Sequence, residues 1–184
     1  MTPPPTASQL APAVVAVPLS GGSAERASHS RLTVVLRDVA QLIRPRITTM
    51  VLVTVAASAW ITSSGSRLRV GELLLVLLGT ALVAASSSIV NQILESSTDR
   101  LMARTARRPL ADGRMSLSVA WWLASALLGA GLCVLVVSSS WQPAVLAFVT
   151  WMLYVCVYTP MKRFSPLNTA VGAIAGALPV LIGW

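Results

Sequence analysis

Near the end of a long apolar stretch, polar side chains recur at four-residue intervals: Asn91, Glu95 and Asp99. We call these three residues the polar row. Residues with this spacing share one face of an α-helix and rise by about 6 Å per step. A helix that has simply left the membrane would explain Asp99 alone, but carboxylates at membrane depth are costly without a partner. Hard oxygen ligands suit Mg²⁺ held together with substrate phosphates. Because Asn91 and Asp99 lie about 12 Å apart along the axis, we expect one or two ions that bridge to a diphosphate.

Cationic side chains lie close to the polar row or at the end of a later apolar run. Arg104, Arg107 and Arg108 follow the row, and Tyr158 and Lys162 are themselves four residues apart. Arginine binds phosphate oxygens through two parallel hydrogen bonds. Arginines also retain a loop on one side of a membrane, which accounts for part of their number. Together with the row, these groups indicate a polyanionic, lipid-derived substrate.

The elements that must position these residues are predicted to be membrane helices. Of the 184 residues, 55% are hydrophobic and only 11% are charged, whereas roughly a quarter of a typical soluble domain is charged. A helix needs about 20 apolar residues to cross a bilayer core, and its backbone groups must pair within the segment. Five apolar runs meet this need, at residues 47–63, 70–94, 115–137, 143–159 and 167–184. The predicted fold class is an all-α transmembrane bundle, here with about five helices.

The distribution of basic residues predicts the orientation of these helices. Twelve of the 14 Lys and Arg residues flank one set of helix ends, and only Arg67 and Arg69 flank the other. The positive-inside rule therefore places the N-terminus in the cytoplasm. Residues 1–34 are rich in Pro, Ala and Ser, so we expect a disordered tail. Its apolar run is broken by prolines and lacks a basic start, which argues against a signal peptide, whereas its lack of acids leaves an organellar transit peptide open. We expect a cell inner (plasma) membrane rather than a mitochondrial inner membrane.

One long motif resembles a known family. The pattern runs Asn91-Gln-x-x-Glu95-x-x-x-Asp99-x-x-Met102-x-Arg104-Thr105-x-x-Arg108-Pro109. It is similar to the first aspartate-rich motif of the membrane-embedded aromatic (UbiA-type) prenyltransferases, and most of all to that of the protohaem IX farnesyltransferases. Shorter stretches agree at residues 44–47, 158–163 and 176–184. The resemblance covers residues 35–184, which would form the N-terminal portion of a transmembrane prenyltransferase domain.

The resemblance implies a fold, an activity and a set of site residues. The fold would be a bundle of about nine membrane-spanning helices around a central cavity. The activity would be Mg²⁺-dependent transfer of a farnesyl group from farnesyl diphosphate to haem B, giving haem O. The substrates and the lipid bilayer are then the partners, with no nucleic acid. The polar row would be catalytic and bind the metal, and the diphosphate would be bound by Arg104, Arg108, Tyr158 and Lys162.

This sequence departs from the family pattern in two ways. Relatives commonly carry a further acid between the positions of Glu95 and Asp99, where this chain has Ser96 and Ser97. Relatives also carry a second acidic motif in a later loop, and the sequence ends before it. We therefore expect an N-terminal fragment or a truncated gene product that holds half of the active site and is inactive alone.

Other functions remain as alternatives. In an ion transporter the polar row would line an ion path, but the cations Arg104 and Lys162 would repel a divalent ion. A non-catalytic assembly or scaffold protein is a further alternative, because the expected second half of the bundle is missing. Another aromatic-ring prenyltransferase would act on a quinone precursor. Gln92 and Glu95 favour haem as the acceptor, because ring prenyltransferases more often carry Asp at both positions.

Overall fold

The computed structural model describes residues 34, 36–63, 69–138, 140–162 and 167–184. The chain divides into two units, Met1–Val35 and Leu36–Trp184, and every element described below belongs to the second. Apart from Val34, which is helical, the predicted disordered tail lies outside the described residues.

The described residues are mainly helical and contain no strand, which confirms the predicted fold class. Four stretches are long and apolar enough to cross a membrane, and the fifth predicted run forms a helix of only 15 residues. The π-helix η1 joins α5 to α6, so these three elements form one continuous rod. The helices are α2 (Pro45–Thr62), α3 (Val70–Asp99), α4 (Leu117–Ser138), α5 (Trp141–Met152), η1 (Leu153–Tyr158), α6 (Thr159–Met161) and α7 (Asn168–Ile182).

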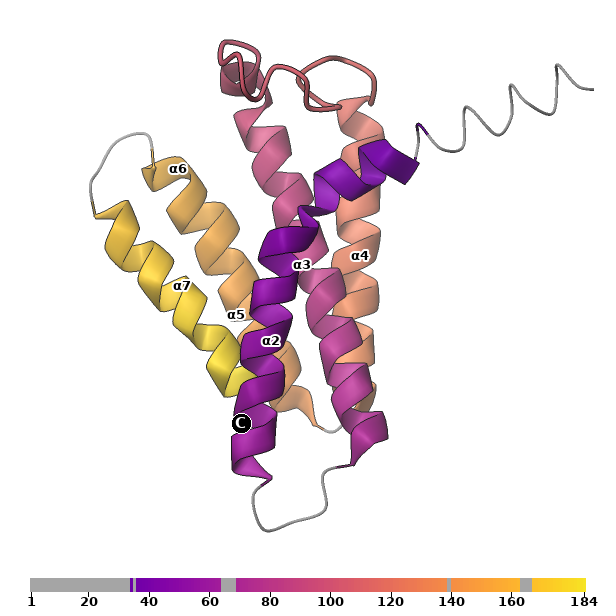
Figure 1. The fold of residues 1–184 in the computed structure, drawn as a ribbon, viewed down its shortest axis with the longest axis vertical. Coiled ribbons are helices and arrows are strands. Elements are labelled where there is room, and N and C mark those ends of the chain that lie inside the picture. Colours follow the sequence, from indigo (N-terminus) through magenta and orange to yellow (C-terminus); the bar gives the residue numbers. More distant parts are fainter. Residues whose placement is uncertain (1–33, 35, 64–68, 139, 163–166) are drawn as a thin grey trace, which may run out of the picture. The chain divides into compact units, whose positions relative to one another are not determined.

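The long helix α3 is the centre of this unit. It packs against α4 on one side and against α2 and α5 on the other, while α7 packs against α5 and α2 (Figure 1). Glycines let α3 and α4 approach closely, because a Cβ atom on Gly131 would lie 2.9 Å from the carbonyl oxygen of Gly79. Small residues at such crossings are common where helices associate in a membrane. The loop after α3 covers the ends of α3 and α4 (Figure 1).

A short helix precedes α2, and the sequence analysis did not predict it. Residues 36–43 are helical, and the helix breaks at Arg44, whose φ of 50° and ψ of 67° lie in the left-handed region. Pro45 begins α2, where its fixed φ is favourable and its missing N–H is not needed. The two helices therefore meet at an angle rather than in one line (Figure 1).

The side chain of Gln92 completes the hydrogen bonding at this break. Because Pro45 has no N–H, the carbonyl of Gln41 loses its usual helical donor. The Nε2 of Gln92 donates to the carbonyl oxygens of Leu42 at 2.8 Å and of Gln41 at 3.4 Å. Both Gln92 and Leu42 are buried. The residue next to Asn91 thus fixes the entry of the chain into α2.

Pro160 disturbs the rod formed by α5 and α6. Its ring clashes with the carbonyl four residues earlier and its nitrogen cannot donate, so the preceding turns widen into a π-helix. The rings of Tyr154 and Tyr158 stack within this segment, with centroids 5.3 Å apart. Single π-helical turns are frequent at functional sites.

A cluster of buried side chains supports the end of α3 that carries the polar row. It joins the helix 36–43, α3, the loop after α3, α4 and η1, and it is apolar throughout. Because such a cluster is close-packed, it fixes the rotation of α3 about its own axis. Its members are Leu42, Ile89, Val90, Ile93, Leu110, Ala120, Ala124 and Val155.

Candidate active site

The polar row lies on one face of the last turns of α3, as its spacing predicts. The Nδ2 of Asn91 donates to Oε2 of Glu95 at 3.1 Å. Asn91 and Asp99 are only 3% and 5% exposed, so the row is not a set of solvated residues at the end of a helix. Buried carboxylates need paired charges or hydrogen bonds, because burial penalises the ionised form.

Two cations from different elements supply the paired charge. The Nη1 of Arg108 lies 2.5 Å from Oδ2 of Asp99 and 3.8 Å from Oε2 of Glu95. The Nζ of Lys162 donates to Oε1 of Glu95 at 3.3 Å. Two carboxylates and two cations therefore meet at one place, and their formal charges cancel.

The loop after α3 folds back so that Arg108 reaches the row. Thr105 is buried, and its hydroxyl donates to the carbonyl of Asp99 at 3.1 Å. The N–H of Arg108 then donates to the carbonyl of Thr105 at 3.0 Å. Arg104 lies in the same loop but is exposed, and within the described residues no hydrogen bond or ion pair joins it to the row. The structure thus brings Arg108 to the row and leaves Arg104 at the surface.

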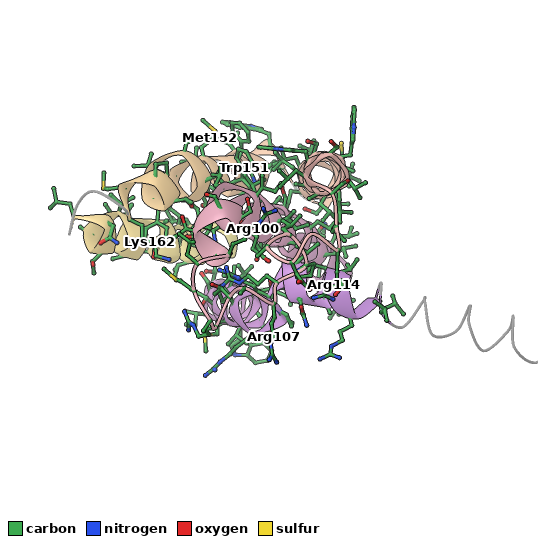
Figure 2. The ribbon with its side chains drawn as sticks, turned by 90° about the horizontal axis from the view of Figure 1, so that it is seen from above. Arg100, Arg107, Arg114, Trp151, Met152 and Lys162 are labelled. Atoms are coloured by element: carbon green, nitrogen blue, oxygen red, sulfur yellow. The ribbon has the colours of Figure 1, made fainter. Side chains whose placement is uncertain are left out.

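A second ion pair ties this loop to the helix 36–43. The guanidinium of Arg114 pairs with Asp38, which is buried, and donates to the carbonyl of Arg107 at 2.8 Å. Asp38 and Arg114 are 76 residues apart in the sequence, so spacing gave no signal of this pair. Seen from this end of the unit, Arg100, Arg107, Arg114 and Lys162 surround the end of α3 (Figure 2).

Thr159 is a site residue that the sequence analysis did not identify. It is buried, and its Oγ1 lies 3.0 Å from Oδ1 of Asn91 and 2.8 Å from the carbonyl oxygen of Tyr154. It connects the π-helical segment to the polar row. Its place between Tyr158 and Pro160 is the only hint in the sequence, because a lone threonine forms no pattern.

An apolar cavity of about 430 Å³ reaches Ser87 and Ser88 of α3, one helical turn before Asn91. Tyr158, predicted to contact a diphosphate, lines this cavity together with Tyr154 and Ser88. The absence of a side chain at Gly172 of α7 leaves room for the ring of Tyr158. A Cβ atom at this glycine would lie 2.9 Å from the ring carbon Cε2. Aliphatic side chains of α2, α3 and α7 form much of the remaining wall, among them Ile47, Val51, Val83 and Ile182.

The oxygen atoms of the polar row could hold a metal ion only if a phosphate-bearing substrate supplied further ligands. Among the described residues, no group of three or more His, Cys, Asp or Glu side chains could hold a metal. Two carboxylates and one amide oxygen are hard ligands, and Mg²⁺ is usually held by one or two carboxylates plus substrate phosphates. The residues present therefore fit Mg²⁺ bound through a phosphate-bearing substrate.

Comparisons with known proteins agree with this geometry. Residues 51–184 match the UbiA prenyltransferase family. Protohaem IX farnesyltransferase of Rhodopirellula baltica is 47% identical over 144 residues, which cover 78% of this chain and 50% of that protein. The protein of the same name from Koribacter versatilis is 35% identical over 151 residues, covering 81% of this chain and 49% of that protein. The chain spans about half the length of the curated relatives it matches.

A solved structure shows the same fold. It comes from work on digeranylgeranylglyceryl phosphate synthase in membranes, and it superposes with a TM-score of 0.72 at 20% sequence identity. The match covers 80% of this chain and 52% of that one. At this identity the likeness is one of fold alone.

Proposed function

Because the chain belongs to the UbiA prenyltransferase family, we propose that the protein transfers a farnesyl group from farnesyl diphosphate to haem B, giving haem O. The observation that carries this proposal is a charge-balanced acid and base cluster beside an apolar cavity. Such a site can hold a polar head and an apolar tail at once. The names of the relatives supply the farnesyl donor and the haem acceptor.

The charges of the site suit a diphosphate. The side chains of Arg108 and Lys162 are 24% and 53% exposed, so both can turn from the carboxylates to phosphate oxygens without unfolding. Arginine binds two such oxygens at once, and lysine acts as a point charge. Arg104 is exposed in the loop above and would close over the diphosphate, while the hydroxyl of Tyr158 would donate from the cavity wall.

Mg²⁺ is the proposed cofactor, and Asn91, Glu95 and Asp99 would hold it together with the phosphate oxygens. When bound, the ion neutralises charge that develops on the leaving diphosphate. Arg108 and Lys162 would do the same, because preorganised charges stabilise the transition state without reorganisation. The bond from the allylic carbon to oxygen breaks, and its electron pair leaves with the diphosphate.

The cavity would protect the allylic cation that remains. Its aliphatic walls exclude water, which would otherwise capture the cation before it meets the vinyl group of haem. The allylic carbon would then bond to the outer vinyl carbon, and a water molecule would add to the inner carbon and lose a proton, which gives the hydroxyl group of haem O. The stacked rings of Tyr154 and Tyr158 line the cavity and would stabilise the cation, because aromatic faces attract cations. Trp151 lines the same cavity, and its indole N–H donates to Ser86 at 3.2 Å, which fixes the ring.

The protein is a membrane protein, and we propose that its N-terminus and the polar row face the cytoplasm. The cations around the end of α3 in Figure 2 support this orientation. A single cysteine in place of Arg107, with Cys133 and Cys156 changed to serine, should react with a membrane-impermeant thiol reagent only from the cytoplasmic side. Labelling of intact cells from outside would reverse the orientation.

Because the chain spans about half the length of its relatives and is expected to be inactive alone, the activity is tested in the full-length protein. Glu95→Gln and Asp99→Asn are introduced there, in membranes supplied with farnesyl diphosphate, haem B and Mg²⁺. Chromatography of the extracted haem should show haem O from the wild type and at least a hundredfold less from either variant. Glu72→Gln is the matched control, since Glu72 is an acid of the same helix at its other end. If a quinone precursor is prenylated in place of haem, the acceptor is wrong. If Glu95→Gln retains turnover, the site is wrong.

A further inference from the structure

The hydroxyl of Thr159 faces two acceptor positions but has only one hydrogen. Its Oγ1 lies 3.0 Å from Oδ1 of Asn91 and 2.8 Å from the carbonyl oxygen of Tyr154. A hydroxyl can donate one hydrogen bond and accept two. Thr159 and Asn91 are 4% and 3% exposed, so both lie away from bulk solvent. The proton of Thr159 can therefore go to only one of the two oxygens, and the Tyr154 carbonyl also accepts the backbone N–H of Thr159.

The choice of acceptor is coupled to the orientation of the Asn91 amide. The two ends of an amide group have nearly the same shape, and the hydrogen-bond network decides which end faces which neighbour. When the threonine proton goes to Asn91, the amide nitrogen faces Glu95 and donates to it, at 3.1 Å. When the proton goes to Tyr154, the lone pairs of Thr159 accept from the amide nitrogen, and the amide oxygen turns to Glu95.

The second orientation is the one that a cation requires. It places the amide oxygen of Asn91 at the present position of the amide nitrogen, which lies 3.1 Å from Oε2 of Glu95. Without a cation these oxygens would repel each other. In an octahedral Mg²⁺ site with bonds of about 2.0–2.1 Å, neighbouring ligands lie about 2.9 Å apart. The spacing of the two side chains thus already matches one edge of a magnesium coordination sphere.

We propose that Thr159 is a positioning residue that orients Asn91 for the metal. Its hydroxyl donates to the carbonyl of Tyr154 and accepts from the Asn91 amide nitrogen, so that the oxygens of Asn91 and Glu95 face the ion together. This inference rests on the proposed function, because it concerns the Mg²⁺ that prenyl transfer uses. It also gives the π-helix a role, since the widened turn before Pro160 brings the Tyr154 carbonyl to the hydroxyl.

The test measures metal binding directly, with Mn²⁺ as the probe. The purified full-length protein in detergent is titrated with Mn²⁺ in the presence of a non-reactive thiodiphosphate analogue of farnesyl diphosphate, and free Mn²⁺ is followed by its paramagnetic resonance signal. Thr159→Val removes the hydroxyl at nearly constant volume and should weaken Mn²⁺ binding about tenfold, the lower end of the range for residues behind a metal ligand. Thr159→Ser keeps the hydroxyl and should remain within about twofold of the wild type.

Two comparisons separate orientation from general damage. Thr54→Val makes the same change in α2, where the hydroxyl donates to the carbonyl of Met50, and Mn²⁺ binding should not change. Asn91→Asp presents oxygen at both ends, so orientation no longer matters. In that background Thr159→Val should cost less than about threefold, because a double-mutant cycle isolates the coupling between the two side chains. If Thr159→Val does not fold, Thr159→Ala in the same two backgrounds measures this coupling.

The outcomes distinguish this inference from the function on which it rests. If the wild type binds Mn²⁺, Glu95→Gln loses it and Thr159→Val does not, the role of Thr159 is overturned and the proposed function stands. An equal loss in the wild-type and Asn91→Asp backgrounds also overturns the role, since orientation then contributes nothing. If the wild type binds no Mn²⁺ with the analogue present, both proposals fail together.

Discussion

The two ends of α3 carry the same kind of ion pair in different surroundings. At its start, Arg69 and Glu72 pair at 2.8 Å with side chains 77% and 43% exposed. At its end, the side chains of Asp99 and Glu95 are only 7% and 14% exposed, and both pair with Arg108. The hydrogen bond to Glu72 and the charge of Glu72 raise the pKa of Arg69, but an exposed pair contributes little to stability. Removing Arg108 or a carboxylate at the other end would leave a buried charge without its partner, which is costly.

Two cavities lie along α3, and their walls differ. The cavity at the start of α3, about 510 Å³, is lined by the exposed pair, by Gln142 and by Trp184. The cavity of about 430 Å³ is mostly apolar, and Ser87 and Ser88, which line it, lie one turn before Asn91. The charged cluster at the end of α3 therefore lies close to the apolar cavity and not to the polar one.

Removing one partner from the buried ion pairs of Glu95, Asp99 and Arg108 should have the largest effect on stability and activity. Arg108→Met leaves Asp99 buried without its cation and should lower the free energy of unfolding by about 3 kcal/mol. Haem O formation should fall at least a hundredfold, since a phosphate ligand is lost as well. Denaturation with sodium dodecyl sulfate in mixed micelles measures the free energy of unfolding, and chromatography of the extracted haem measures haem O formation. A stability change below about 0.5 kcal/mol would show that the pair is effectively solvated.

Loss of the hydrogen bonds that Gln92 donates at the break before α2 should have the second-largest effect on stability. Gln92→Leu leaves the carbonyls of Leu42 and Gln41 without their side-chain donor and should cost about 2 kcal/mol, within the range for buried unsatisfied groups. Gln142→Leu is the matched control at the other end, where the side chain is exposed and should contribute almost nothing. Equal effects of the two substitutions in the same denaturation assay would contradict this role of Gln92.

A smaller effect is expected where Tyr158 meets α7. Gly172→Ala places a methyl group against the tyrosine ring and should displace it, at a cost of about 1 kcal/mol for an off-rotamer side chain. We expect about fivefold slower farnesyl transfer, which corresponds to that energy. Gly71→Ala has open space around it and should leave the rate unchanged. If Gly172→Ala and Gly71→Ala both keep the wild-type rate, the contact between Gly172 and Tyr158 does not matter for transfer.

The exposed pair should show the smallest effect. Arg69→Met removes the partner of Glu72, and the unfolding free energy should change by less than about 0.5 kcal/mol. Haem O formation should be unaffected. If Arg69→Met lowered the free energy of unfolding as much as Arg108→Met, burial would not explain the difference between the ion pairs at the two ends of α3.

The sequence predicted the elements well because each is a local property. Apolar runs, their lengths and the four-residue spacing of the polar row placed α2, α3, α4 and the rod from Trp141 to Met161 within a few residues of their observed bounds. The last run was predicted to span and forms a shorter helix, Asn168–Ile182. The break at Arg44 and the π-helix before Pro160 were not predicted, because a proline signals a disturbance without specifying its geometry.

The composition of the site was only partly predictable. The motif named Asn91, Glu95 and Asp99, since one helix carries all three at a spacing that sequence alone reveals. Lys162 and Arg108 were assigned to a diphosphate by resemblance, and the structure shows that both also pair with the row's own carboxylates. The assignment of Arg104, Arg108, Tyr158 and Lys162 to the diphosphate stays a prediction.

By itself, the sequence determined that this is a helical membrane protein with an acidic face at the end of its second apolar run. Only the tertiary structure decided which groups meet that face. Thr159 lies 68 residues from Asn91, and Lys162 lies 67 from Glu95. No periodicity links residues so far apart, because their contact depends on how α3 packs against the rod from Trp141 to Met161. The charge balance of the polar row is therefore a property of the packed helices rather than of the motif.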